Sequence, residues 1–399
     1  MVISLDKEKK DGQTIFKQAS KQASKQARNS SIELLKIVAI FLIVISHVSQ
    51  TLITNNVYVI WDDYLIPKTA TTNISNLIVF IFQYFGPFGN SVFFICSAWF
   101  LIDNDKVSGR KILRMILDVW TISFILCCTV LFLKSGDVSF KLLIKQFFPT
   151  TFANNWYMTC YLLFYPIHGI LNKMMTGITQ KGLLCFASIS GVIYIGLNFI
   201  KNNLFFTSSL LLWIVIYIVL SYIKRYTSWI TNRILNLCLL ILSLTLNTFL
   251  IVGTNYLGLH ISFFNDKVFR WWNNCNPFLL IAAFSLLNLA KNVHFTNKAI
   301  NYISSMSMLI YIIHENELLR TYYRPALWHI IYNQFGYDHL IFWVFVMSLG
   351  VFAFGVVMSM FYHHTFEKVV DKETDWLLPK IQKLYGKYER IMIGEAYTD

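Results

Sequence analysis

Charged residues are scarce in this chain: they make up 14% of the 399 residues, and proline (7) and glycine (17) are also few. Hydrophobic residues account for 56% of the sequence, and the mean hydropathy is +0.52. This composition excludes a soluble globular domain. It also excludes a disordered chain, because disorder requires low hydrophobicity and high charge. The sequence therefore predicts an all-α, polytopic integral membrane protein.

The seven cysteines lack the spacing of a metal or redox site. Most lie in apolar segments, without a Cys-x-x-Cys pair or a Cys/His metal pattern. We interpret them as small core residues and predict neither a disulfide framework nor a metal site. The formal net charge of +13 would suggest nucleic acid as the partner of a soluble protein. In a membrane protein positive charge sets topology, so we predict membrane lipids as partners and no nucleic acid.

About ten segments are long and apolar enough to be membrane-spanning helices. With the N-terminus in the cytoplasm, 24 basic residues fall in inner segments and 9 in outer loops, while one more lies in the first span. Positive residues concentrate on the cytoplasmic side, so both termini are predicted to be cytoplasmic. The apolar segments begin after a long polar leader, which argues against a cleavable signal peptide. The predicted spans are 32–52, 76–101, 112–134, 154–172, 182–200, 204–223, 234–253, 275–290, 302–320 and 339–362.

The chain therefore divides into three predicted parts. Residues 1–30 form a polar, basic cytoplasmic leader, and residues 31–365 form the membrane domain. Residues 366–399 form a cytoplasmic tail with a weakly amphipathic segment that could lie along the membrane face.

The first span contains ionisable residues, which are costly in hydrocarbon and therefore suggest function. Lys36 and His47 are eleven residues apart. This is about three helical turns, so they share one face about 16 Å apart. Glu33 lies three residues before Lys36 and points nearly the same way. Two interpretations of the Glu33 and Lys36 pair remain open, a functional one and mutual neutralisation near the interface. For His47, which lies too deep to reach water easily, we favour the functional interpretation over a structural one.

The segment ELLKIVAIFLIVISHV resembles the opening signature of acyltransferase family 3, integral-membrane proteins that O-acylate bacterial cell-surface glycans. That signature has a basic residue, ten intervening positions and a histidine. Here the basic residue is Lys36, where arginine is usual, and the histidine is His47. Lysine lacks the bidentate fork of arginine, so the contact at this position is expected to differ.

Further segments support this resemblance, in the expected order, over residues 30 to 365. Phe85–Ile102 is similar to the family pattern Gly-x-x-x-Phe-Phe-x-x-Ser-Gly-Phe, with Ala98 and Trp99 at its last two positions. The others are the basic cluster Arg110, Lys111 and Arg114, the aromatic segment Asn154–Ile167, and Ile303–Arg320, which looks like the family's late Ser-x-x-Tyr-x-x-His segment and contains Tyr311 and His314.

The resemblance implies an O-acetyltransferase of the bacterial plasma membrane, with acetyl-CoA as donor and a polysaccharide or lipid-linked glycan as acceptor. His47, Glu33 and His314 are the catalytic candidates, and His47 and His314 are expected at similar depth, with Glu315 close by. Lys36, Arg110 and Arg114 are the candidates for binding acetyl-CoA. A structural role for His314, and positive-inside charge alone for the two arginines, remain open alternatives.

Two roles for His47 fit this function, a general base that deprotonates a sugar hydroxyl and a nucleophile that carries the acyl group. The same composition would suit a glycan export or transport component without covalent chemistry. Transfer of succinyl in place of acetyl is a further alternative within the family.

Overall fold

The protein consists almost entirely of helices. The structure is a computed structural model that describes residues 29–53, 66, 70–133, 138–200, 209–227, 231–265, 267–336 and 338–393, with side chains to residue 383. Within these ranges no strand occurs, and the all-α prediction is confirmed. Apart from Asn29 and Ser30, the predicted leader lies outside the described residues. The π- and 3₁₀-helices are η2 (Gly191–Gly196), η4 (Ser262–Phe264), η5 (Lys267–Trp272) and η6 (Leu319–Tyr323).

Among the described residues, seven helical segments are long and apolar enough to cross a membrane. They correspond to the first, second, third, fifth, sixth, seventh and tenth predicted spans, and the protein is a multi-pass membrane protein. The segments are α2 (Ser30–Gln50), α3 and α4 together (Ile74–Gln83 and Phe85–Leu101), α5 (Gly109–Leu133), α8 to α9 (Gln180–Ser190, η2 and Leu197–Ile200), α10 (Ser209–Tyr226), α11 (Arg233–His260) and α16 (Leu340–Thr365).

The other three predicted spans are helical, but the structure does not confirm them as spans. α7 (Trp156–Gly177) contains Pro166 and a polar stretch that lowers its hydropathy. α12 (Pro277–Lys291) has 15 residues, about 22 Å, whereas the hydrocarbon core is about 30 Å thick. The ninth predicted span is interrupted at Met306 and forms α13 (Lys298–Ser305) and α14 (Ser307–His314). Ten spans are therefore not confirmed.

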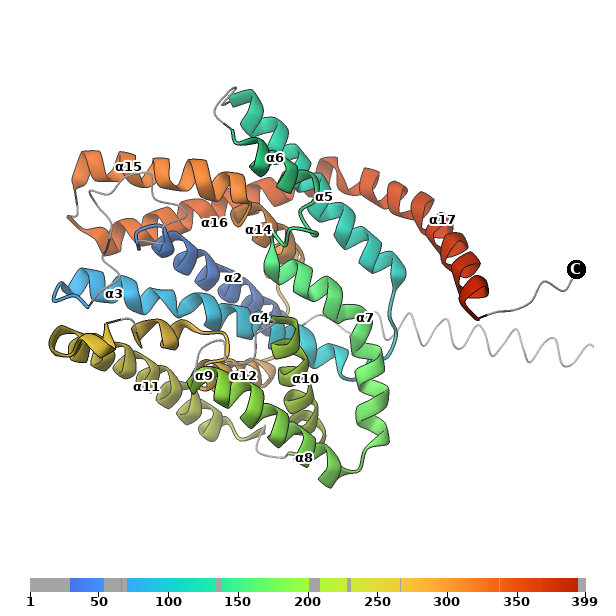
Figure 1. Ribbon diagram of the computed structural model, residues 1–399, viewed down its shortest axis with the longest axis horizontal. Coiled ribbons are helices and arrows are strands. Elements are labelled where there is room, and N and C mark those ends of the chain that lie inside the picture. Colours follow the sequence, from blue (N-terminus) through green and yellow to red (C-terminus); the bar gives the residue numbers. More distant parts are fainter. Residues whose placement is uncertain are drawn as a thin grey trace, which may run out of the picture.

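Helix α2 lies in the middle of the bundle, between α16 and the α3–α4 segment (Figure 1). Two glycines of α4 allow the close approach of these helices. A Cβ atom on Gly89 would come within 2.6 Å of the Ala39 carbonyl oxygen, and one on Gly86 would come as close to Ser46 Oγ. Small residues at helix contacts are common in membrane proteins, because backbones can then pack directly. This packing fixes the face that α2 presents to its other neighbours.

The first turn of α2 is held by the segment between α12 and α13. Asn29 caps the helix by accepting a hydrogen bond from the Ser31 amide. The Ser31 hydroxyl donates to the carbonyl oxygens of Ala290 and Val293 at 2.5 and 2.7 Å, and the Ser30 amide donates to Phe295. These bonds position the end of α2 that contains Glu33 and Lys36.

The C-terminal helix α17 (Glu367–Ile393) extends from the bundle and pairs with the start of α5 (Figure 1). Arg110 binds Asp371 at 3.2 Å and Asp375 at 2.7 Å. The hydrogen bond from Arg110 lowers the pKa of Asp375 below its usual range. Arg114 binds Asp371 at 2.9 Å and also pairs with Glu367.

The remaining helices are α6 (Phe140–Phe147) and α15 (Arg324–Phe335).

We expect Arg114→Ala to destabilise the protein more than Arg110→Ala. Arg114 also lies 3.8 Å from the buried carboxylate of Asp118, which accepts a hydrogen bond from Tyr362 at 2.7 Å. Losing this guanidinium leaves a buried carboxylate short of a partner, at a cost of about 1–3 kcal/mol. Arg110 is solvent-exposed, and its ion pairs are screened. Thermal unfolding in detergent measures the difference. Equal unfolding temperatures for the two variants would contradict this interpretation.

Candidate active site

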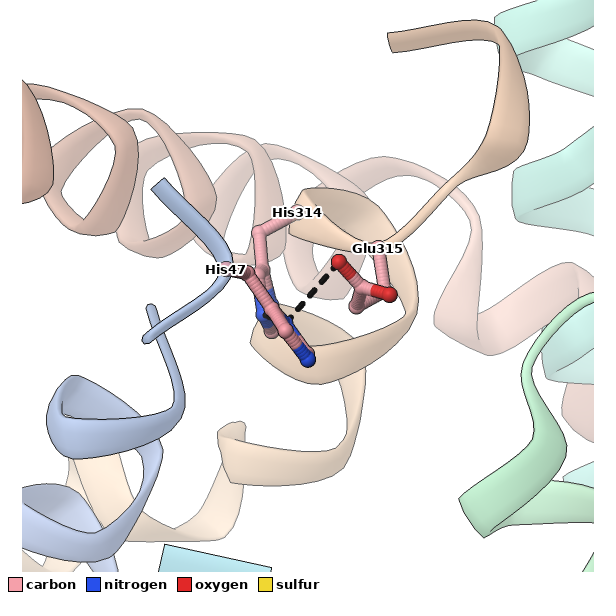
Figure 2. A group of neighbouring side chains, drawn as sticks. All are labelled: His47, His314 and Glu315. Carbon is pink, nitrogen blue, oxygen red and sulfur yellow. Dashed lines mark hydrogen bonds and ion pairs between the residues drawn. The ribbon is translucent and has the colours of Figure 1, made fainter. Parts of the chain in front are cut away.

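Two histidines and a glutamate from segments far apart in the sequence meet at one end of α2 (Figure 2). His47 Nδ1 lies 2.9 Å from Glu315 Oε1 and 3.2 Å from His314 Nε2. The imidazole rings are stacked, with centroids 5.5 Å apart and planes inclined by 26°. All three residues are buried. The structure thus brings His47 and His314 to the same depth, as their positions in the sequence predict.

The hydrogen bonds determine which nitrogen of each imidazole bears the proton. His314 Nδ1 lies 2.9 Å from the Ile310 carbonyl oxygen, so it must donate there, and its Nε2 is left as an acceptor. His47 Nδ1 faces that acceptor and the Glu315 carboxylate, so His47 bears its proton on Nδ1. Within the part of the chain that is described, His47 Nε2 has no hydrogen-bond partner. Neutral His47 therefore has a free lone pair on Nε2, as a general base requires.

Glu315 is held by two arginines from the segment that follows it. Arg320 donates to Glu315 Oε2 at 3.1 Å, and Arg324 donates to Oε1 at 3.4 Å. Arg324 is itself buried, and it also donates to the carbonyl oxygens of His47 at 3.2 Å and His314 at 2.7 Å. A buried carboxylate requires such partners, because its desolvation is costly. Arg324 thereby joins the end of α2 to the end of α14.

Local helix irregularities place these groups. α14 ends at His314, and Glu315 follows as its C-cap residue, so adjacent side chains can both reach His47. The π-helix η6 contains Arg320 and is followed directly by Arg324 at the start of α15. Short π-helices are frequent at functional sites, since the wider turn redirects side chains.

His47, His314 and Glu315 are also the kind of ligand set that binds a divalent metal. Their ligand atoms lie within 4.8 Å of one another. Imidazole and carboxylate suit zinc in particular. Arg320 and Arg324 neutralise the carboxylate, however, and place two positive charges where a dication would have to bind. The electrostatics of the site therefore favour the hydrogen-bonded form.

A cavity of about 270 Å³ extends along α2 from its N-terminal half toward this site. Lys36 and Lys111 line it at one end, and Ile43, Tyr157 and Tyr311 line it closer to the histidines. Ile43 lies four residues before His47 and Tyr311 three before His314, so the lining ends about one helical turn, roughly 5 Å, from the imidazoles. The cavity links a cationic end of the protein to the candidate active site.

Tyr157 lines this cavity, and its hydroxyl is buried. It has no hydrogen-bond partner among the described residues. A buried hydroxyl without a partner costs free energy, so this group is available to a polar atom of a ligand.

Glu33, a predicted catalytic residue, lies away from the histidines. It is fourteen residues before His47, which is about 21 Å along the helix. Its carboxylate accepts a hydrogen bond from the Ser304 hydroxyl at 2.5 Å and lies 3.5 Å from Lys36 Nζ. The structure therefore groups Glu33 with Lys36 at the cationic end of the cavity, and places Glu315 beside His47 instead.

Of the predicted acetyl-CoA-binding residues, Lys36 lines the cavity and the two arginines do not. Arg110 and Arg114 point toward α17, whose carboxylates bind them. Lys111, between them in the sequence, lines the cavity, and its ammonium group lies 4.4 Å from the Tyr165 ring centroid. The spacing explains this: residues 110 and 114 share a helix face, whereas residue 111 points about 100° away.

Arg320, Arg324 and Lys111 have roles in the structure that their sequence positions did not predict. Arg320 and Arg324 were counted as outer-loop charges, and Lys111 only as part of a basic cluster. One signal was present: His-Glu-Asn-Glu directly follows an apolar run, and an arginine follows five residues after Glu315. The partner of Glu315 could not be identified from that pattern alone.

In this multi-pass membrane protein, two buried imidazoles thus lie about one helical turn beyond the lining of a cavity. Residues 29–364 match the family model described as an acyltransferase domain, and the chain belongs to acyltransferase family 3. It is a membrane-bound acyltransferase that transfers groups other than amino-acyl groups. No curated protein and no solved structure matches the chain.

We expect Glu315→Gln to destabilise the protein strongly and Glu317→Gln to have a small effect. The first change leaves two guanidinium groups without their buried carboxylate, which costs about 3–5 kcal/mol. Glu317 forms a more exposed ion pair with Lys145 at 2.7 Å, worth about 0.2–1 kcal/mol. The measurement is thermal unfolding in detergent, followed by tryptophan fluorescence. Similar losses for both variants would show that Glu315 has no special role.

Proposed function

We propose that this protein is an O-acetyltransferase of a bacterial plasma membrane. It transfers acetyl from cytoplasmic acetyl-CoA to a hydroxyl of a cell-surface or secreted polysaccharide, such as a capsule or exopolysaccharide, or of its lipid-linked precursor. The single observation that supports this most is the position of His47. Its Nδ1 is held by Glu315 and His314, and its free Nε2 lies beyond the end of a cavity whose other end is cationic.

The cavity suits the acyl end of the donor. Its volume of about 270 Å³ is small beside the roughly 300–1,000 Å³ of pockets for whole drug-sized ligands. An acetyl thioester and part of its slender arm would fit, while the nucleotide would remain at the cationic end. Lys36 and Lys111 are placed to attract its phosphates there. The Tyr157 hydroxyl is available to donate a hydrogen bond to a polar atom along the arm.

In the proposed reaction His47 acts as a general base. As the sugar hydroxyl oxygen attacks the thioester carbonyl, His47 Nε2 takes the hydroxyl proton. The new C–O bond forms, the C–S bond breaks, and the leaving thiolate receives the proton that His47 took from the hydroxyl. Glu315 stabilises the imidazolium that forms, as a carboxylate does for a catalytic histidine. In the second form of the proposal, His47 Nε2 attacks the thioester carbonyl itself, the C–S bond breaks and the thiolate leaves. The acetyl group on His47 then passes to the sugar oxygen, and the thiolate takes up the proton that the hydroxyl loses.

Membership of an acyltransferase family favours catalysis over a transport role without covalent chemistry. The positive-inside pattern supports cytoplasmic termini, which would place the Lys36 end of α2 on the side of the donor. The glycan acceptor would then approach His47 from the opposite side. Succinyl transfer is the alternative within the same chemistry, and the acyl group found on the product distinguishes the two.

We expect His47→Ala to abolish O-acetylation, because His314 Nε2 and the Glu315 carboxylate both face His47 Nδ1, and His47 Nε2 is the nitrogen of this group that is left free to take a proton. The control is His260→Ala, which changes an exposed histidine at the end of α11. Proton NMR of the purified polysaccharide from cells that express each variant at equal levels measures the acetyl signal. Acetylation that persists at the wild-type level in His47→Ala would refute the proposed mechanism. Loss of the polymer itself in a deletion strain would support an export function instead.

We expect Lys111→Gln to raise the KM for acetyl-CoA about tenfold, since one charge-assisted contact to phosphate is worth about 1.5–3 kcal/mol. Arg110→Gln is the matched control, because α17 already holds that guanidinium. Steady-state kinetics of the purified enzyme, with acetyl-CoA varied, provide the test. A larger KM effect for Arg110→Gln would show that the arginine binds the donor and that α17 moves away when it does.

A further inference from the structure

A second pocket lies on the other side of α4 from the candidate active site. It has a volume of about 220 Å³ and is lined by apolar side chains of α4, α10, α12 and η2. On α4 its lining residue is Ile95, whereas Phe93 and Ser97 line the cavity beside α2. The two spaces are therefore separate. The lining residues of this pocket are Ile95, Ile195, Ile216, Val219, Leu220, Ile223, Pro277, Leu280, Ile281 and Phe284.

A cationic cluster lies at the end of this apolar surface. Along α10, Lys224 follows Leu220 by four residues, and along α12, Lys291 follows Phe284 by seven, so each lysine continues its pocket-lining face. Trp99 likewise follows Ile95 by one turn. Lys224 Nζ lies 4.6 Å and Lys291 Nζ 3.5 Å from the centroid of the Trp99 ring.

The cluster has an excess of positive charge. Lys224 pairs with the exposed carboxylate of Asp103 and donates to the Trp99 carbonyl oxygen at 2.5 Å. For Lys291, no carboxylate within salt-bridge distance occurs in the described part of the chain. Two partly buried ammonium groups that share one indole repel each other, and an anion between them would remove this repulsion.

The arrangement of apolar and charged groups matches that of a membrane lipid. The pocket offers almost no polar group, which excludes a sugar or a nucleotide, and it has room for part of an acyl chain. Along α10 the cationic cluster follows the last lining residue, Ile223, directly, and along α12 it begins about 10 Å beyond Phe284, counted at about 1.5 Å per residue. Basic pockets between membrane helices bind anionic headgroups in this way.

We propose that the groove formed by α4, α10 and α12 is a binding site for an anionic phospholipid. One acyl chain lies in the apolar pocket, and the headgroup phosphate binds Lys224 and Lys291 beside Trp99. The lipid would join α10 and α12 over α4. This site is independent of the proposed transfer reaction, since no residue of the acyl-donor cavity lines it.

The test is native mass spectrometry of the purified full-length protein, titrated with phosphatidylglycerol or phosphatidylcholine. We expect the first phosphatidylglycerol molecule to bind with a dissociation constant about tenfold lower than that of the first phosphatidylcholine molecule. In Lys291→Gln the two lipids should bind with equal affinity. Lys298→Gln, which changes an exposed lysine at the start of α13, is the matched control and should bind like the wild type.

A second variant tests the apolar part of the site. Ile281→Trp, at a partly exposed position, fills the pocket and should lower the affinity for phosphatidylglycerol about tenfold while both lysines remain. An excess of inorganic phosphate should not displace the lipid. Equal binding by Lys291→Gln and Lys298→Gln would overturn the proposal, as would wild-type binding by Ile281→Trp. Displacement by phosphate alone would show that the cluster binds a free anion and not a lipid.

Discussion

The buried carboxylate of Glu315 is the constraint on which the rest of the site depends. Such a group is stable inside a membrane protein only when its charge is matched. Here Arg320 and Arg324 match the charge, and His47 donates a hydrogen bond to the carboxylate. Because Arg324 also binds the backbone carbonyls at the ends of α2 and α14, the same network fixes the relative position of two helices that are distant in the sequence. The protonation of His47 then follows from geometry, and its Nε2 is left free for chemistry.

The sequence predicts a good part of this arrangement. Composition alone defines an all-α membrane protein, and the depth of His47 and His314 follows from their positions along apolar segments, because helical rise is constant. The depth of a residue along a helix does not determine, however, the direction in which its side chain points. Whether two histidines at one level face each other depends on helix packing, here on the close contact that Gly86 and Gly89 allow between α4 and α2. Glu33 was predicted to be catalytic because it shares a helix face with Lys36 and His47, but the structure pairs it with Lys36 and Ser304, away from the imidazoles.

The donor side was harder to predict for a related reason. Arg110, Lys111 and Arg114 are similar in sequence terms, and only α17, from the opposite end of the chain, distinguishes them. Its carboxylates bind the two arginines, whereas Lys111 lines the cavity.

The number of membrane spans was also only partly predictable from the sequence. α12 and the α13–α14 pair are apolar enough to resemble spans, yet one is short and the other is interrupted at Met306. Hydropathy measures composition and does not detect such breaks.

The central claim is that Glu315 and His314 hold the proton of His47 on Nδ1. The most direct measurement is ¹⁵N NMR of the histidine side chains in the reconstituted protein at neutral pH, with the His47 signal assigned by comparison with His47→Gln. We expect a protonated Nδ1 and an unprotonated Nε2 for His47. A proton on Nε2, with Nδ1 unprotonated, would contradict it, because His47 could not then act as the base or the nucleophile through that nitrogen.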